Sequence, residues 1–82
     1  AGDLAGELIE AILPPASDIS YQAPARIGLE HHLVMLEGQL SLIVEGREHH
    51  LRAGDCLRYK LTGHSRFITP ADSSAKYLLF ML

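Results

Sequence analysis

The chain has 82 residues, enough for one compact domain, and its 48% of hydrophobic and 21% of charged residues exclude an intrinsically disordered chain. A formal net charge of -3 argues against direct binding to nucleic acid, which usually needs a basic surface. One cysteine excludes an internal disulfide and fits a reducing compartment, and no apolar run reaches the roughly 20 residues that cross a bilayer.

The N-terminal segment allows a helix or a strand. Behind Asp3, which could cap a helix, apolar residues recur at helical spacing: Leu4, Leu8, Ile9 and Ile12. Pro14 and Pro15 end the segment, and a strand over residues 6–13 would help to close a sheet. We predict the strand. The stretch that follows, up to Gly28, is predicted to be an irregular loop near the mouth of the fold.

From residue 33 onward, apolar residues recur at every second position, which is typical of strands. The first clear run ends at Gly46 and has three apolar residues on one face: Leu40, Leu42 and Val44. A second run follows at once, with His49 and Leu51 on one face. The two runs are predicted to form a hairpin.

The last third of the chain continues the same pattern. A third strand is predicted over residues 57–61, and two more over residues 66–69 and 76–81, separated by a turn-rich segment at residues 70–74. Several short strands divided by turns at this spacing indicate an all-β sandwich or barrel.

Three segments carry a resemblance to a known family: Leu36-Glu37-Gly38-Gln39-Leu40, Gly46, and Leu51-Arg52-Ala53-Gly54-Asp55. Their combined spacing, over roughly residues 30–64, resembles the core of the cupin superfamily. With Leu13-Pro14-Pro15 before it and Tyr77-Leu78-Leu79-Phe80 after it, the whole chain resembles the C-terminal cupin domain of XRE-type helix-turn-helix transcriptional regulators. The resemblance implies an all-β fold, the small cupin double-stranded β-helix or jelly-roll barrel. It also implies that residues 1–82 are a single cupin domain of a longer chain with an N-terminal DNA-binding domain.

The turn residues agree with this fold. Three glycines of the motif segments can supply the positive φ that is needed where strands reverse: Gly38, Gly46 and Gly54. Asp55 is predicted to accept a hydrogen bond within its own turn.

Five histidines raise the question of a metal site. Metal-dependent cupins carry two histidines one residue apart, then a glutamate and a further histidine, and the positions of the paired histidines fall here near Pro24 and Arg26. The ligands that remain are His31 or Glu30, together with His64 and His49. A firm transition-metal site presents three or four protein ligands. We therefore predict neither a metal nor another cofactor, and leave open a weak site at Glu30 or His31 with His64.

The interior of the barrel is the predicted ligand site. Neighbours in a strand point to opposite faces, so only one ring of His31-His32 and one of His49-His50 can point inward. An inward ring either has a protein partner or contacts a ligand. The predicted ligand-binding residues give apolar walls with a few polar groups: His31, Met35, Leu42, His49, Tyr59 and His64.

Catalytic residues are not indicated. A nucleophilic Cys56 would need a lowered pKa and a positioned base, and the sequence indicates neither, so we predict a buried structural thiol. The glutamates include no pair whose strand positions favour acid–base work; Glu37 and Glu45 are expected to be solvated. Tyr59 and Tyr77 are expected inside the barrel, with their hydroxyls near a rim. The chain is therefore not predicted to be an enzyme.

The function predicted from the sequence is that of an effector-sensing and/or dimerisation domain of a transcriptional regulator, with a small molecule bound in the barrel. We expect a homodimer, because a chain this short buries little surface alone. We also expect a cytoplasmic protein without a membrane partner. Contact with DNA is expected only through the N-terminal domain. The alternatives are a small metal-dependent cupin enzyme, a dioxygenase or isomerase, and a free-standing oligomerisation or sugar-binding barrel.

Overall fold

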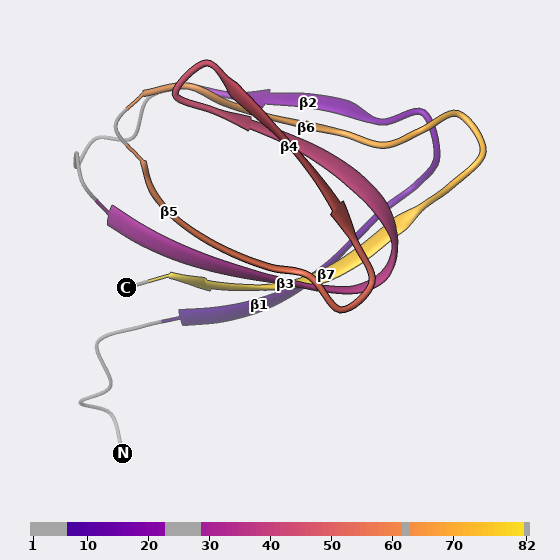
Figure 1. The fold of residues 1–82 in the computed structure, drawn as a ribbon, viewed down its shortest axis with the longest axis horizontal. Helices are drawn as coiled ribbons and strands as arrows, with labels where there is room; N and C mark the ends of the chain where they lie inside the picture. The colour runs from indigo at the N-terminus through magenta and orange to yellow at the C-terminus, as the bar shows by residue number, and fades with distance from the viewer. Residues whose placement is uncertain (1–6, 23–28, 62, 82) are drawn as a thin grey trace.

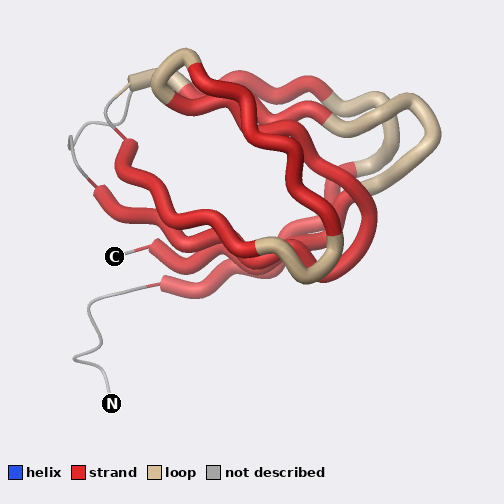
Figure 2. The backbone as a smooth tube through the Cα atoms, in the orientation of Figure 1, coloured by secondary structure: helices blue, strands red, loops and turns tan. Residues whose placement is uncertain are grey.

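The computed structural model describes residues 7–22, 29–61 and 63–81, and these residues form seven β-strands and no helix (Figure 2). Among them there is accordingly no helix that could span a membrane. In chain order the strands are β1 (Glu7–Leu13), β2 (Asp18–Tyr21), β3 (Leu29–Val44), β4 (Arg47–Arg52), β5 (Cys56–Leu61), β6 (Ser65–Ile68) and β7 (Ala75–Met81). The all-β prediction is confirmed.

Strand β3 organises the molecule because it belongs to both layers of the barrel. It has 16 residues; its first half pairs with β5 and β7, and its second half pairs with β4 and β6. The register between β3 and β7 shifts between Met35 and Glu37, which marks a bulge at Leu36. Figure 1 shows the result: β1, β7, β5 and the start of β3 form the lower layer, and β3 then curves at the right into the upper layer with β2, β4 and β6.

Strand β1 forms although its sequence also has helical periodicity. All seven of its residues pair antiparallel with β7, from Glu7 opposite Met81 to Leu13 opposite Ala75. An isolated helix of this length is unstable in water, whereas the ladder satisfies the backbone at once. The predicted strand is confirmed and the helical alternative is wrong for residues 7–13; Asp3 and Leu4 lie outside the described residues.

The predicted loop from Pro14 to Gly28 is wrong in part, because it contains β2. This four-residue strand pairs only with β6, and two contacts between distant segments hold it there. Thr69 Oγ1 accepts a hydrogen bond from the Ser17 amide at 2.8 Å and donates one to the Pro14 carbonyl at 2.7 Å. Arg66 donates two hydrogen bonds to the Asp18 carboxylate, at 2.7 and 2.5 Å. The residues that hold β2 in place therefore lie some fifty positions away in the chain, and a local sequence pattern does not indicate them.

The predicted hairpin between β3 and β4 is confirmed, with Leu42 opposite His49 and Leu40 opposite Leu51. The three remaining predicted strands are confirmed as β5, β6 and β7, each within one residue of the expected bounds. Strand β3 begins at Leu29, earlier than the alternation from residue 33 indicated.

All three motif glycines have positive φ, as predicted: Gly38 (79°), Gly46 (72°) and Gly54 (93°). Gly46 and Gly54 lie in turns, but Gly38 lies inside β3 and not at a reversal, which corrects the expectation for that residue. A Cβ on Gly38 would lie 1.8 Å from the Ser74 carbonyl oxygen, so glycine allows β7 to begin against β3. The expected hydrogen bond of Asp55 is also present, since its carboxylate accepts from the Arg52 amide at 2.8 Å.

The core lies between the two layers, where the inward side chains of both halves of β3 meet. Its largest fully buried side chains are Leu33, Met35, Leu40 and Leu42. Each such residue stabilises the fold by roughly 1.5–3 kcal/mol relative to an exposed position. The core is centred on the curve of β3, and it leaves the other end of the barrel less filled.

Candidate ligand pocket

A pocket of about 370 Å³ lies between the layers at the end of the barrel away from the curve of β3. Strand β3 begins at this end, and β5 and β7 finish there, at the left in Figure 1. Side chains from both layers line the pocket: Ile9, Ala11, Tyr21, Gln22, His31, Tyr59, Ser65, Phe67, Tyr77, Leu79 and Met81. Its volume is within the range of about 300–1,000 Å³ that small-molecule sites usually have.

Strand register places the polar pair of the pocket. His31 on β3 lies opposite Tyr59 on β5 and, on its other side, opposite Met81 on β7. Opposite residues of an antiparallel pair point to the same face, so all three side chains point into the barrel. The same rule brings Leu79 beside Ile9 on the adjoining edge strand.

His31 and Tyr59 form a contact in a largely apolar setting. The Nδ1 atom of His31 and the hydroxyl oxygen of Tyr59 lie 3.4 Å apart, and the two rings meet edge to face with centroids 5.3 Å apart. Only 7% of His31 and 9% of Tyr59 is exposed. Burial lowers the pKa of His31 and raises the pKa of Tyr59, because both charged forms lose solvation. Both side chains are therefore neutral at pH 7.

Three further rings form one wall. Phe67 stacks on Tyr77, with centroids 5.9 Å apart, and Tyr21 meets Phe67 edge on at 5.5 Å. Burial raises the pKa of Tyr77 to about 12, so its hydroxyl stays protonated. Among the described residues this hydroxyl has no hydrogen-bond partner, and it is not sealed from the pocket. The wall thus offers an aromatic surface with a free donor.

No family model matches the sequence, and no curated protein matches it. Solved structures do. The cupin domain of an XRE-family transcriptional regulator from Enterobacter cloacae aligns with a TM-score of 0.88 and 16% identity, over 99% of this chain and 84% of that chain. An HTH_3-family transcriptional regulator from Vibrio cholerae aligns with a TM-score of 0.82 and 20% identity, over 99% of this chain and 44% of that chain. A predicted oxalate decarboxylase from Thermotoga maritima aligns with a TM-score of 0.70 and 19% identity, over 92% of this chain and 64% of that one.

This chain has the cupin fold. The jelly-roll barrel implied by the motif segments is therefore confirmed. The similar structures include transcriptional regulators and a predicted decarboxylase, and one fold can serve different roles, so the function of this chain has to be argued from its own side chains.

The cupin barrel brings together two of the six predicted ligand-binding residues, His31 and Tyr59. Met35 and Leu42 also point inward, but they are fully buried in the core and do not line the pocket. His49 is half-buried on β4, on the same face as Leu42, and it too is not among the lining residues.

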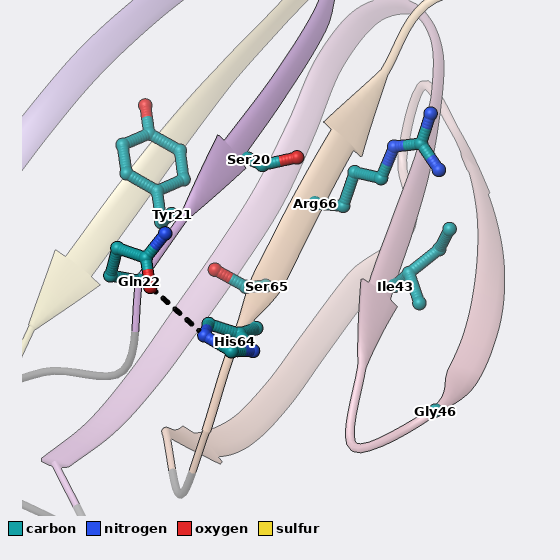
Figure 3. Close-up of a pocket in the computed structure, with 8 residues that line it drawn as sticks. All are labelled: Ser20, Tyr21, Gln22, Ile43, Gly46, His64, Ser65 and Arg66. Carbon is teal, nitrogen blue, oxygen red and sulfur yellow. Dashed lines mark hydrogen bonds between the residues drawn. The ribbon is translucent and has the colours of Figure 1, made fainter.

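His64, the sixth predicted residue, lies in a separate hollow just before β6. Figure 3 shows it beside Gln22, to whose side-chain oxygen its Nε2–H donates a hydrogen bond at 3.0 Å. Tyr21, Gln22 and Ser65 line both sites, so the hollow adjoins the pocket. The hollow is exposed, and Arg66, which lines it, is already paired with Asp18.

Several lining residues were not singled out from the sequence as ligand contacts. They include most of the aromatic wall and the apolar side chains beside it: Tyr21, Phe67, Tyr77, Leu79 and Ile9. Tyr77 was expected inside the barrel, and it is 5% exposed. The alternation of Tyr77, Leu79 and Met81 in β7 was a usable signal, because it places all three on the inner face.

A metal site does not fit the described part of this cupin barrel. Among the described residues, no three histidine, cysteine, aspartate or glutamate side chains are grouped so that they could hold a metal ion. Glu30 lies on the outer face, next to His31 in sequence but opposite in direction, and His32 donates to it at 3.2 Å. This hydrogen bond lowers the pKa of Glu30. The positions near Pro24 and Arg26 lie outside the described residues.

The prediction of a buried Cys56 thiol is wrong, because this residue is exposed. Tyr59 points inward and Cys56 is three positions before it in β5, so the alternation directs Cys56 to the outer face. Glu37 and Glu45 are exposed, as expected.

Proposed function

We propose that this cupin barrel is the effector-binding domain of a transcriptional regulator and that a small molecule binds in the pocket around His31 and Tyr59. The observation that carries the proposal is the pocket itself, about 370 Å³ between the layers, mostly apolar and with a few polar groups. The similarity in fold to cupin domains of transcriptional regulators supports it. Contact with DNA would come through another domain of the regulator.

Two copies would pair through the outer face of β1 and β7. Leu8 is 63% exposed, Ile12 is 65% exposed and Phe80, which lies opposite Leu8, is 38% exposed. The same face also holds the Glu10–Lys76 ion pair. Strand β1 has a neighbour on one side only among the described strands, and an open edge beside a mainly apolar face favours association with an identical edge. A second copy of this chain is the occupant we expect.

Strand β1 also connects this face with the pocket. Ile9 and Ala11 line the pocket, while Leu8 and Ile12 point outward from the same strand. A ligand that contacts the inner face of β1 therefore acts on the strand that the partner would cover. Regulation follows if the ligand binds one arrangement of the two copies more tightly than another.

The metal-dependent enzyme is the second function that the sequence left open. A dioxygenase or isomerase of that kind needs three or four ligands in one place, and the described residues bring no such set together. No particular observation favours it over the effector-binding domain.

Thermal unfolding of the wild-type chain with a panel of small acids, amines and neutral compounds tests ligand binding. A compound present at 100 times its Kd should stabilise the fold by about 2.7 kcal/mol. The variant Ala11→Phe, which places a ring in the pocket, should lose this stabilisation. Ala53→Phe makes the same change at an exposed turn and should keep it. If no compound of the panel stabilises the wild type, or if both variants respond alike, the pocket is not an effector site.

Light scattering at micromolar concentration tests the pairing. The wild type should have the mass of a dimer. Ile12→Lys should produce the monomer, because it removes an apolar contact and places a second cation opposite Lys76, whereas Ser20→Lys, on an exposed position of β2, should leave the dimer intact. A monomeric wild type would overturn the pairing but not ligand binding.

A further inference from the structure

The pocket around His31 has polar groups, but none of the described residues that line it carries a formal charge. Among its described lining residues there is no aspartate, glutamate, lysine or arginine. The polar side chains are hydroxyls, one amide and one imidazole: Tyr21, Tyr59, Tyr77, Ser65, Gln22 and His31. The charged residues of the same strands point outward and pair there, as Arg66 does with Asp18 and Lys76 does with Glu10.

The His31–Tyr59 contact can serve as either a donor or an acceptor. A neutral imidazole carries one N–H, and the Nδ1 atom can either accept from the Tyr59 hydroxyl or donate to its oxygen over the same 3.4 Å. In the first tautomer the Tyr59 oxygen can still accept, and in the second its hydroxyl proton is free to donate. A ligand group that both donates and accepts, such as a hydroxyl, matches the pair in either state.

The remaining walls favour a flat ring. Phe67 and Tyr77, stacked within 26° of parallel, both line the pocket, and aliphatic side chains of β1 and β7 line it next to them. Aromatic surfaces gain from offset stacking as well as from burial. The Tyr77 hydroxyl, which has no hydrogen-bond partner among the described residues, adds a donor at this wall.

We infer that the pocket selects an uncharged, ring-bearing molecule with one hydroxyl or carbonyl group over acids and amines of the same shape. This inference rests on the proposed function and names the class of effector. Among the described lining residues, a carboxylate that entered the pocket would lose its hydration without meeting a cation, and an ammonium would lose it without meeting a carboxylate. A neutral hydroxyl loses much less and regains a hydrogen bond from His31 or Tyr59.

Three probes of nearly equal shape test the inference: 2-naphthol, 2-naphthoate and 2-naphthylmethylammonium. Each is titrated into the wild-type chain at pH 7.5, and the ring proton signals of His31 and the tyrosines are followed by NMR. We expect 2-naphthol to bind at least about tenfold more tightly than either ion, since a penalty of 1.4 kcal/mol is a factor of ten. Naphthalene rings placed at the wall should shift the His31 and Tyr77 signals in the wild type, so this readout does not depend on a variant that folds.

Two variants locate the contacts. Tyr59→Phe keeps the ring and removes the hydroxyl, and it should lower the affinity for 2-naphthol about fivefold. Unchanged affinity would overturn the role given to the His31–Tyr59 pair. Ala53→Phe should change nothing. Binding of either ion as tightly as 2-naphthol overturns the inference on charge. If acids or amines of the wider panel bind in the pocket and 2-naphthol does not, the effector site stands and only its class is wrong. If no compound binds, both proposals fail.

Discussion

Strand β3 has no room for a side chain at Gly38, so Gly38→Ala should destabilise the barrel far more than Gly46→Ala. Both glycines have positive φ, 79° and 72°, and an alanine there costs about 1–2 kcal/mol. At Gly46 nothing lies within 4 Å of the added Cβ, and the lower entropy of the unfolded chain offsets roughly 0.4–1 kcal/mol. The net cost at Gly46 is therefore about 1 kcal/mol.

The same Cβ at Gly38 would lie 1.8 Å from the Ser74 carbonyl oxygen, so the backbone at the start of β7 has to move. That oxygen accepts a hydrogen bond from the Gln39 amide N–H, and the residue after Ser74, Ala75, is fully buried. A lost hydrogen bond costs about 0.5–1.5 kcal/mol and a displaced core residue about 1–3 kcal/mol. With the conformational cost included, Gly38→Ala should destabilise the fold by about 3–5 kcal/mol.

Urea unfolding followed by circular dichroism measures both variants against the wild type, with equal m-values as the check on two-state behaviour. The free energies of unfolding of the two variants should differ by at least about 2 kcal/mol. This corresponds to a melting temperature about 10 °C lower for Gly38→Ala than for Gly46→Ala. If the two differ by less than about 0.5 kcal/mol, the close approach of β7 to Gly38 does not exist.

Three further predictions concern the core, the buried histidine and the thiol. Leu42→Ala should cost about 2–5 kcal/mol in urea unfolding, whereas Leu36→Ala at the partly exposed bulge should cost less than about 1 kcal/mol; equal losses would contradict the assigned faces. Burial lowers the pKa of His31 from 6.5, so between its folded and unfolded values the unfolded chain binds more protons, and stability should rise with pH towards neutrality and fall as the pH drops below 6.5. His31→Leu should reduce this slope between about pH 5.5 and 7, above the window of the acidic groups Asp18 and Glu30, and an unchanged slope would show that His31 does not cause it. Cys56 should react with a thiol reagent without denaturant, and a protected thiol would contradict the outward direction of the Cys56 side chain in β5.

Alternation in the sequence was sufficient to assign the faces of single strands. It placed Leu42 and His49 on one face of a hairpin, and these residues are opposite partners in the structure. It failed for β2, because four residues give too short a pattern and the pairing with β6 joins segments far apart in the chain. For the thiol the signal was present, since alternation in the strand predicted over residues 57–61 puts Leu57 and Tyr59 on one face and so directs Cys56 to the other.

The pocket could be predicted only in part, because alternation gives the face of a residue and not its depth. His31, Met35 and Leu42 all point inward, yet His31 lies at the open end while the other two are in the core. Depth depends on the register between strands and on the position of the bulge at Leu36, two residues before the last pair that β3 forms with β7. A local sequence pattern predicts neither the register nor the position of the bulge. The aromatic wall depends in the same way on contact across layers, between Phe67 of β6 and Tyr77 of β7.

The register of β1 decides whether ligand binding and pairing can influence each other. Because side chains alternate, a shift of one residue against β7 would turn Ile9 and Ala11 outward and bring Leu8 and Ile12 into the pocket. Such a shift would also carry Glu10, which shares the outer face with Leu8 and Ile12, into the apolar barrel, so it is disfavoured. A ligand seated against Ile9 and Ala11 therefore stabilises the same register that presents Leu8 and Ile12 to a second copy. Ligand binding should accordingly raise the affinity between the two copies, and dimerisation should raise the affinity for the ligand by the same factor.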